Sequence, residues 1–145
     1  MKKKKKINPL KYNKYFLYEN SVQSPELEIS FINRVFKNLR GRRPISIKED
    51  FCATASFCCE WVMKSPKNKA YGVDLDQVPL KWALKYQLIK LQPDEVKRID
   101  LRLANVLDRF KPAVDVVTAL NFSYFIFKKR EVLKAYFKNV YRTLN

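Results

Sequence analysis

Apolar residues first follow a helical pattern near the N-terminus of the chain. Between residues 24 and 41 they recur every four positions, with two more beside them: Leu27, Phe31, Val35 and Leu39, then Ile32 and Phe36. Ser24 and Pro25 suit the start of a helix, and Gly41 suits its end. The pattern therefore predicts an amphipathic helix over residues 24–40 whose apolar stripe packs on a neighbour.

After residue 43 the apolar pattern alternates between the period of strands and that of helices. Strands are predicted over residues 44–50, 69–75, 98–106 and 113–120, and helices over 53–64, 78–91 and 128–145. Short connections between alternating strands and helices imply right-handed crossovers. We expect an α/β fold with about four mostly parallel strands, flanking helices and an additional N-terminal helix.

Positive charge is concentrated in the first third of the chain. Among 145 residues there are 30 Lys and Arg against 14 Asp and Glu, and residues 1–48 carry 13 of the basic and 3 of the acidic side chains. Such an excess attracts nucleic acid, anionic membrane surfaces or acidic ligands. No apolar run approaches the ~20 residues that span a bilayer. Residues 1–14 are predicted to be a disordered basic tail of a cytoplasmic protein and a candidate contact for nucleic acid.

The three cysteines do not predict a metal or redox site. Cys52, Cys58 and Cys59 lack CxxC spacing, and the chain has no histidine to complete a zinc site. We expect no metal. The cysteines are interpreted as small buried residues of a reduced core.

The end of the first predicted strand and the end of the second are candidate ligand positions. Parallel sheets bind ligands at the carboxyl ends of their strands, and the loop that follows Glu49 has no glycine, so a dinucleotide fingerprint is absent. Asp74 ends the second strand about 20 residues beyond that loop, which is the separation expected for a carboxylate that binds a ribose diol. Asp76 is predicted to cap the helix that starts near Val78.

Four segments together resemble a known family: "LYENSVQSPELEISFINRVFKNLRGRRP", "IKEDFCATA", "YGVDLD" and "VDVVTALNFSYFIFKKREVLKAYFKNV". They are similar to a bacterial subgroup of class I S-adenosylmethionine-dependent methyltransferases, whose first motif reads E-D-F-C-G-T-A. The likeness covers residues 15–145. It implies a Rossmann-like methyltransferase fold with strand order 3-2-1-4, a helical cap segment over residues 15–43 and the N-terminal part of the methyltransferase domain over residues 44–145.

The resemblance also implies the site residues. Those expected to bind S-adenosylmethionine are Glu49, Phe51, Cys52, Ala53, Thr54, Asp74, Leu75, Asn105 and Val106. Asn121 and Tyr124 would face the methyl acceptor, whose identity the resemblance leaves open. Tyr18 and Gln23 would fold over the cofactor.

The sequence departs from the family at two places. Ala53 stands where the family motif has glycine, and the family continues into a fifth strand beyond the helix at which this sequence ends. The resemblance thus implies a truncated and inactive fragment as one alternative, with residues 114–120 as an uncovered edge open to self-association.

A non-catalytic module is the other alternative. It would bind RNA through the lysine tail and the exposed face of the helix over residues 24–40.

Overall fold

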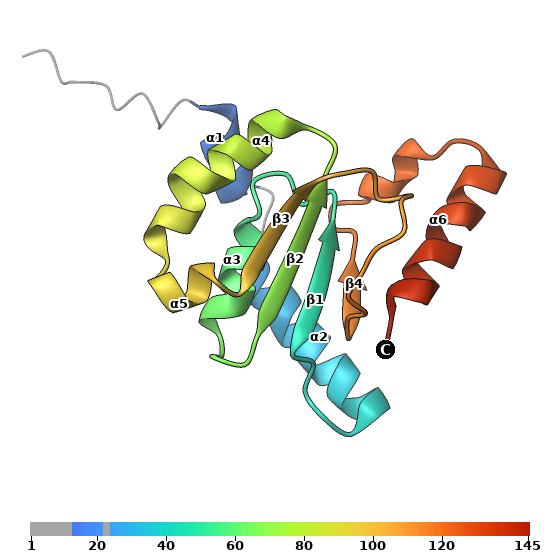
Figure 1. Ribbon diagram of the computed structural model, residues 1–145, viewed down its shortest axis with the longest axis horizontal. Helices are drawn as coiled ribbons and strands as arrows, with labels where there is room; N and C mark the ends of the chain where they lie inside the picture. Colours follow the sequence, from blue (N-terminus) through green and yellow to red (C-terminus); the bar gives the residue numbers. More distant parts are fainter. Residues whose placement is uncertain (1–12, 22–23) are drawn as a thin grey trace, which may run out of the picture.

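A four-stranded parallel sheet positions all other elements of the protein (Figure 1). The computed structural model describes residues 13–21 and 24–145, so most of the predicted basic tail lies outside the described residues. The strands are β1 (Ser46–Asp50), β2 (Lys69–Asp74), β3 (Ile99–Leu103) and β4 (Val116–Thr118). They run in the order β3-β2-β1-β4, with Ile47 of β1 opposite Ala70 of β2 and Val116 of β4. The predicted α/β fold and strand order are therefore confirmed.

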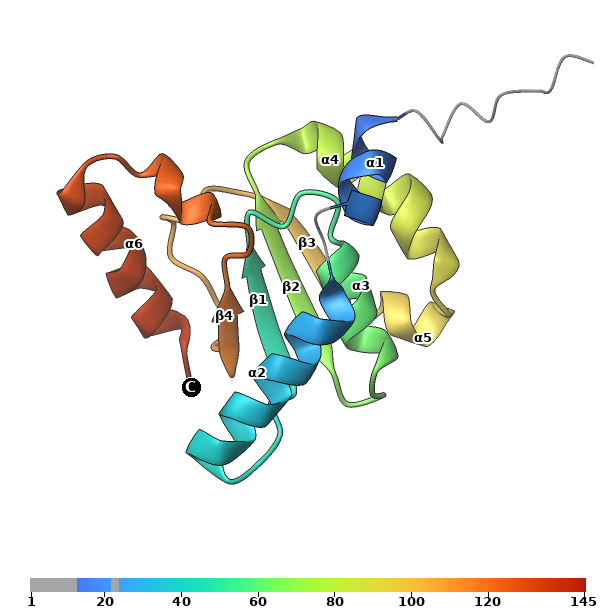
Figure 2. The same ribbon diagram turned by 180° about the vertical axis from the view of Figure 1, so that it is seen from behind.

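Helices cover the sheet from two sides (Figures 1 and 2). Among the described residues they are α1 (Lys14–Ser21), α2 (Pro25–Arg40), α3 (Ser56–Met63), α4 (Gln77–Trp82), the π-helix η2 (Ala83–Gln87), the 3-10 helix η3 (Leu88–Lys90), α5 (Pro93–Val96), the 3-10 helix η4 (Ser123–Ile126) and α6 (Arg130–Thr143). The segments α2 to α5 lie on one side and α6 lies on the other, beside β4. None of these helices is long and apolar enough to cross a membrane.

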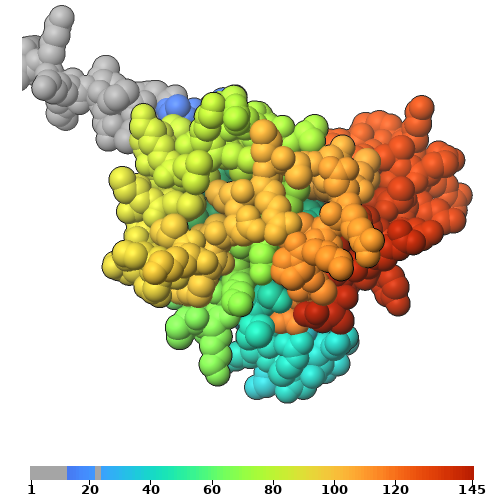
Figure 3. All heavy atoms as spheres, in the orientation of Figure 1, coloured from blue at the N-terminus to red at the C-terminus, as the bar shows by residue number. Residues whose placement is uncertain are grey.

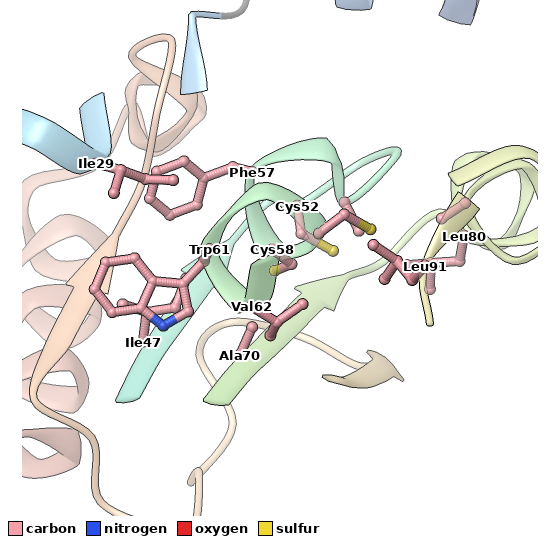
Figure 4. Close-up of a cluster of buried hydrophobic side chains, with 13 residues drawn as sticks. Ile29, Ile47, Cys52, Phe57, Cys58, Trp61, Val62, Ala70, Leu80 and Leu91 are labelled. Atoms are coloured by element: carbon pink, nitrogen blue, oxygen red, sulfur yellow. The ribbon is translucent and has the colours of Figure 1, made fainter. Parts of the chain in front are cut away.

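The larger core lies between α3 and the sheet (Figure 4). Phe57, Trp61 and Val62 of α3 are fully buried, as are Ile47 of β1 and Ala70 of β2. Alternate residues of a strand point to opposite faces of a sheet, and Tyr71, next to Ala70, accordingly packs against the smaller core, as Lys48, next to Ile47, lies over the Phe110 ring of that core. That second core contains Val73, Val106, Phe110, Val114 and Tyr136.

The apolar stripe predicted on α2 is wrong for most of its residues. Ile29 is only 3% exposed and Ile32 packs against the larger core, so these residues form the inner face. Leu27 is 73% exposed and Leu39 is 76% exposed. Four residues of the predicted stripe are therefore exposed, namely Leu27, Phe31, Val35 and Leu39, whereas Ile32 of the same stripe packs inward.

The helix after β2 begins where the sequence predicts. Asp76 caps it, because its carboxylate accepts the N–H of Val78 at 2.8 Å. The single helix predicted over residues 78–91 is wrong in its interior, where α4 continues into the wider π-helix η2 and then into η3. The Trp82 and Tyr86 rings lie 4.2 Å apart across the junction of α4 and η2.

The outer edge of the fourth strand is partly covered. The N–H of Val114 donates to the carbonyl of Thr143, and the N–H of Asn145 donates to the carbonyl of Val114, both at 2.9 Å. The prediction of an uncovered edge is therefore wrong at Val114. Along β4 itself no further strand of the described residues pairs on the outer side.

Candidate functional site

The candidate site lies at the edge where the carboxyl ends of the strands meet. β1 ends at Asp50, β2 at Asp74, β3 at Leu103 and β4 at Thr118. The connections that follow these strands carry the site residues predicted from the sequence. In parallel sheets this edge is where ligands bind, because helix N-termini and irregular backbone are gathered there.

Asp74 links two of these connections. One of its carboxylate oxygens accepts the N–H of Ala53 at 2.7 Å, and the other accepts the N–H of Asp76 at 2.8 Å. A carboxylate oxygen has two lone-pair positions. Asp74 therefore fixes the loop after β1 against the end of β2 and still has acceptor capacity for a ligand.

The loop after β1 has an unusual backbone conformation. Phe51, Ala53 and Ala55 have φ values of 59, 46 and 55°, in the left-handed region. Glycine is the residue that adopts this region without a steric penalty, and each non-glycine residue there is strained by about 1–2 kcal/mol. The sequence contains no glycine in this loop, yet hydrogen bonds such as that from the Cys52 N–H to the Val73 carbonyl hold the conformation.

Glu49 is a buried acid one residue before the end of β1. Its side chain is 2% exposed, and its carboxylate accepts the thiol of Cys58 at 3.1 Å. Burial raises the pKa of Glu49 to about 8, although the bond from Cys58 opposes this shift. The nearby charges of Glu28 on α2 and of Asp74 raise it further. Glu49 is thus protonated at neutral pH unless a cation lies beside it.

The side chains of two predicted site residues are buried and not accessible to a ligand. Cys52 and Thr54 are fully buried, and the Cys52 side chain lies so close to Gly72 of β2 that a Cβ there would come within 2.9 Å of its sulfur. Burial raises the pKa of the Cys52 thiol well above its ordinary value. All three cysteines are free and buried, which confirms their interpretation as core residues. Any contact that Cys52 makes with a ligand is therefore through its backbone.

The residues predicted to contact adenine lie after β2 and β3. Leu75 is 70% exposed. Asn105 is exposed, and its side-chain oxygen accepts the N–H of Leu107 at 3.0 Å, which forms a turn. Val106 is buried in the smaller core, and its carbonyl accepts the side-chain amide of Asn139. Leu75 and Asn105 are accessible, whereas the Val106 side chain is not.

The residues predicted to face the acceptor lie after β4. Asn121 has a left-handed φ of 54°, and its side-chain amide donates to the Tyr18 hydroxyl of α1 at 2.8 Å. Tyr124 packs edge-on against Phe137 of α6. The structure therefore brings Tyr18 and Asn121 together across the carboxyl edge, while Gln23 lies outside the described residues.

Sequence reasoning missed a buried charge network beneath the site. Lys48 of β1 forms an ion pair with Asp50, which also accepts the Tyr136 hydroxyl of α6 at 3.0 Å. Burial raises the pKa of Asp50, and its bonds from Lys48 and Tyr136 oppose that shift. Tyr136 is 86 residues away in the sequence, so no local pattern identifies the partner.

Two acids of the N-terminal helices were also missed. Glu28 of α2 has one carboxylate oxygen that is buried without a hydrogen-bond partner among the described residues, and burial raises its pKa. Glu19 of α1 accepts the ring N–H of Trp82 at 3.1 Å, which ties α1 to α4. From the sequence alone, both acids are indistinguishable from ordinary exposed residues of a helix.

No family model matches the chain, and no curated protein matches it. Solved structures do. A sugar N-methyltransferase, KedS8 from Streptoalloteichus, has a TM-score of 0.69 at 20% identity, covering 90% of this chain and 48% of its own. The SAM-bound amino pentose methyltransferase CalS10 from Micromonospora echinaspora has a TM-score of 0.68 at 14% identity, covering 89% and 50%.

A third match is the plantazolicin methyltransferase BpumL, solved with a pentazolic desmethylPZN analog and SAH. Its TM-score is 0.70 at 13% identity, covering 89% of this chain and 47% of that one. The chain therefore spans about half the length of these structures. At these identities the matches establish the architecture alone: the described part of this chain has the four-strand, partial Rossmann-like arrangement found in class I methyltransferases.

Proposed function

We propose that this chain is the S-adenosylmethionine-binding part of a methyltransferase that acts on an acceptor not yet identified. The observation that carries the proposal is Asp74, which ends the second strand of a methyltransferase-like sheet and fixes the loop after the first. A carboxylate with remaining acceptor positions at this point suits the two hydroxyls of a ribose.

The charges at this edge support a cationic ligand. Glu28, Glu49 and Asp74 are close enough for Glu28 and Asp74 to raise the pKa of Glu49, and one Glu28 oxygen has no partner among the described residues. S-adenosylmethionine carries an ammonium group and a sulfonium group. Such charges would stabilise the ionised form of Glu49, so the residues present fit this cofactor.

The proposed roles follow the positions of the residues. Asp74 would hold the ribose, Glu49 and the loop of Phe51, Cys52, Ala53 and Thr54 would surround the methionine part, and Leu75, Asn105 and Val106 would border the adenine. Asn121 and Tyr124 would face the acceptor. Residues 15–43 would cap the site, since the hydroxyl of Tyr18 already contacts Asn121.

The cofactor would supply an activated methyl group. The protein's part would then be alignment and exclusion of water, which need no nucleophilic side chain. The absence of histidine from the sequence is consistent with such a reaction. That the protein is bacterial stays a prediction from the resemblance, and that it is cytoplasmic stays a prediction from its N-terminal sequence.

Calorimetric titration with S-adenosylhomocysteine tests the proposal. Asp74→Ala should lower affinity by about 1.5–3 kcal/mol, or about 10- to 150-fold, because a charged hydrogen-bond partner is lost. Asp76→Ala is the matched control: it removes a carboxylate two residues away whose partner is the helix N-terminus, and it should change affinity by less than about threefold. If Asp74→Ala binds S-adenosylhomocysteine with the affinity of the unmodified protein, the assignment of Asp74 to the ribose is refuted.

A further inference from the structure

A second hollow of the molecule lies away from the carboxyl edge. It has a volume of about 940 Å³ and lies between α6 and the connection from β3 to β4. Its walls are Leu107, Arg109, Phe110, Lys111 and Ala113 on one side and Ala135, Lys138, Asn139, Arg142 and Thr143 on the other. In Figure 3 the connection and α6 form adjoining orange and red surfaces. We name this hollow the α6 groove.

The α6 groove is strongly cationic. Arg109 and Lys111 face it from the connection and Lys138 and Arg142 face it from α6, and in the described part of the chain no acidic residue lines it. None of these four cations belongs to an ion pair formed within residues 13–21 and 24–145. Unpaired cations on both walls of a concave surface concentrate positive potential, which attracts an anion.

Hydrogen bonds hold the two walls in place. The side-chain amide of Asn139 on α6 donates to the carbonyls of Val106 and Asp108 at 2.9 and 2.7 Å. Arg102 of β3 donates to the carbonyl of Lys111 at 2.8 Å and lies over the Phe110 ring at 4.5 Å. The cations therefore project from a preorganised frame, which reduces the entropy lost on binding.

The arrangement favours a chain of phosphates over a single anion. On the α6 wall, Lys138 and Arg142 lie four residues apart, a rise of about 6 Å, and Arg109 and Lys111 lie on the opposite wall. A flat bilayer surface would not enter a concave channel with cations on both walls. Phe110 is only 8% exposed, so it offers little surface on which a base could stack.

We propose that the α6 groove binds the sugar–phosphate backbone of single-stranded nucleic acid without reading its sequence. This site differs from the lysine tail and the α2 face that the sequence pointed to, and it does not depend on cofactor binding. Binding should weaken with salt, because phosphate contacts release counterions at a slope of about −0.7 per contact for single strands.

The test is fluorescence anisotropy with a labelled uridine oligonucleotide of about 12 residues between about 50 and 200 mM salt. Lys138→Glu with Arg142→Glu should weaken binding by at least about tenfold and reduce the salt slope by about 1.4. Arg34→Glu with Lys37→Glu, on the exposed face of α2, makes the same change in charge and should weaken binding by less than about threefold. Circular dichroism confirms folding, and Lys138→Gln with Arg142→Gln is used instead if charge reversal unfolds the chain.

Several outcomes would overturn the proposal. Equal loss in the two double variants would assign binding to diffuse charge. Displacement of the RNA by millimolar inorganic phosphate would assign the groove to small phosphate compounds. Binding to phosphatidylserine vesicles that depends on Lys138 and Arg142, with RNA binding unaffected by them, would assign it to a membrane surface.

Discussion

Ala53 adopts a conformation that glycine adopts without strain. Its φ of 46° lies in the left-handed region, and its N–H is the one that Asp74 fixes. Ala53→Gly removes the steric strain there, while glycine's extra freedom in the unfolded chain costs about the same, so stability should change by less than about 1 kcal/mol. Affinity for S-adenosylhomocysteine should rise several-fold, because backbone without a Cβ can approach a ligand more closely.

The control for this substitution is Ala83→Gly. Ala83 has an ordinary helical φ of −54°, so glycine there should lower the free energy of unfolding by about 1 kcal/mol. Calorimetry and thermal unfolding measure both effects. Weaker binding in Ala53→Gly would show that the loop has adapted to alanine.

Glu49 should make the stability of the protein depend on pH. Its pKa is about 8 in the folded state against an ordinary value of 4.5. Within this window the folded state keeps a proton that the unfolded state has released, so the free energy of unfolding falls as pH rises, by up to about 1.4 kcal/mol per pH unit. Glu49→Gln, which stays neutral, should reduce this slope and unfold at higher denaturant concentration near pH 8.

Denaturant titrations of Glu49→Gln and of the exposed control Glu131→Gln across this pH range check the prediction. The control should retain the slope of the unmodified protein. If Glu49→Gln also retains it, another group, such as Asp50 with its raised pKa, is responsible.

At the scale of elements, α2 has two apolar faces with different tasks. Ile29→Ala should lower the free energy of unfolding by about 2–4 kcal/mol, because Ile29 is buried and its loss leaves a cavity. Leu27→Ala removes an exposed side chain and should change the free energy by less than about 0.5 kcal/mol. Denaturant unfolding compares the two. Equal losses would show that the outer face is covered in solution.

The face of α2 could not be predicted from spacing alone, for a geometric reason. Residues four apart are displaced by about 40° around a helix, so a repeat from Leu27 to Leu39 turns by about 120° and does not mark one face. Ile29 and Ile32 contact the core because α2 packs against α3. This is a tertiary contact that the local sequence does not encode. The mostly parallel sheet, by contrast, was predictable, since alternating strands and helices allow few topologies, and the strand order was predicted from the family resemblance.

The candidate site divides in the same way. Asp76 was predictable as a cap because its partner Val78 is two residues away. The position of Asp74 at the carboxyl edge was predictable because strand ends meet at one edge. The Asp50–Tyr136 bond and the charge of Glu28 beside Glu49 were not. These contacts join distant parts of the sequence through side chains, and no periodicity records them.

At the scale of the whole molecule, β4 is fastened firmly at its N-terminal end. The carboxylate of Asp115 accepts hydrogen bonds from Nη2 of Arg42 at 2.6 Å and from the backbone N–H groups of Ile45 and Ser46. It also accepts one from the side-chain amide of Asn145 at 3.3 Å. Although burial opposes ionisation, these bonds hold the pKa of Asp115 below its ordinary value. The strand is therefore rigidly placed, and its outer edge is a preformed row of backbone groups.

The last prediction concerns that edge. The N–H of Asp115 donates to β1, and the N–H of Val114 donates to the opposite side. Backbone N–H groups alternate along a strand, so the N–H of Val117 points toward β1, and those of Val116 and Thr118 point outward. Unpaired edge groups beside exposed apolar residues favour strand addition. We predict self-association through β4 at micromolar concentration. It should strengthen with salt, because screening weakens repulsion between copies that each carry a net charge of +16.

Sedimentation velocity and amide hydrogen exchange measure this association together. The sedimentation coefficient should rise with protein concentration, and exchange at Val116 and Thr118 should slow in parallel, while Asp115 and Val117, which face β1, are protected at every concentration. This pattern separates edge pairing from association through the apolar face of α2, which would leave Val116 and Thr118 in fast exchange. A monodisperse monomer whose Val116 and Thr118 amides are already protected would contradict the prediction, because it would mean that the edge is satisfied within one copy.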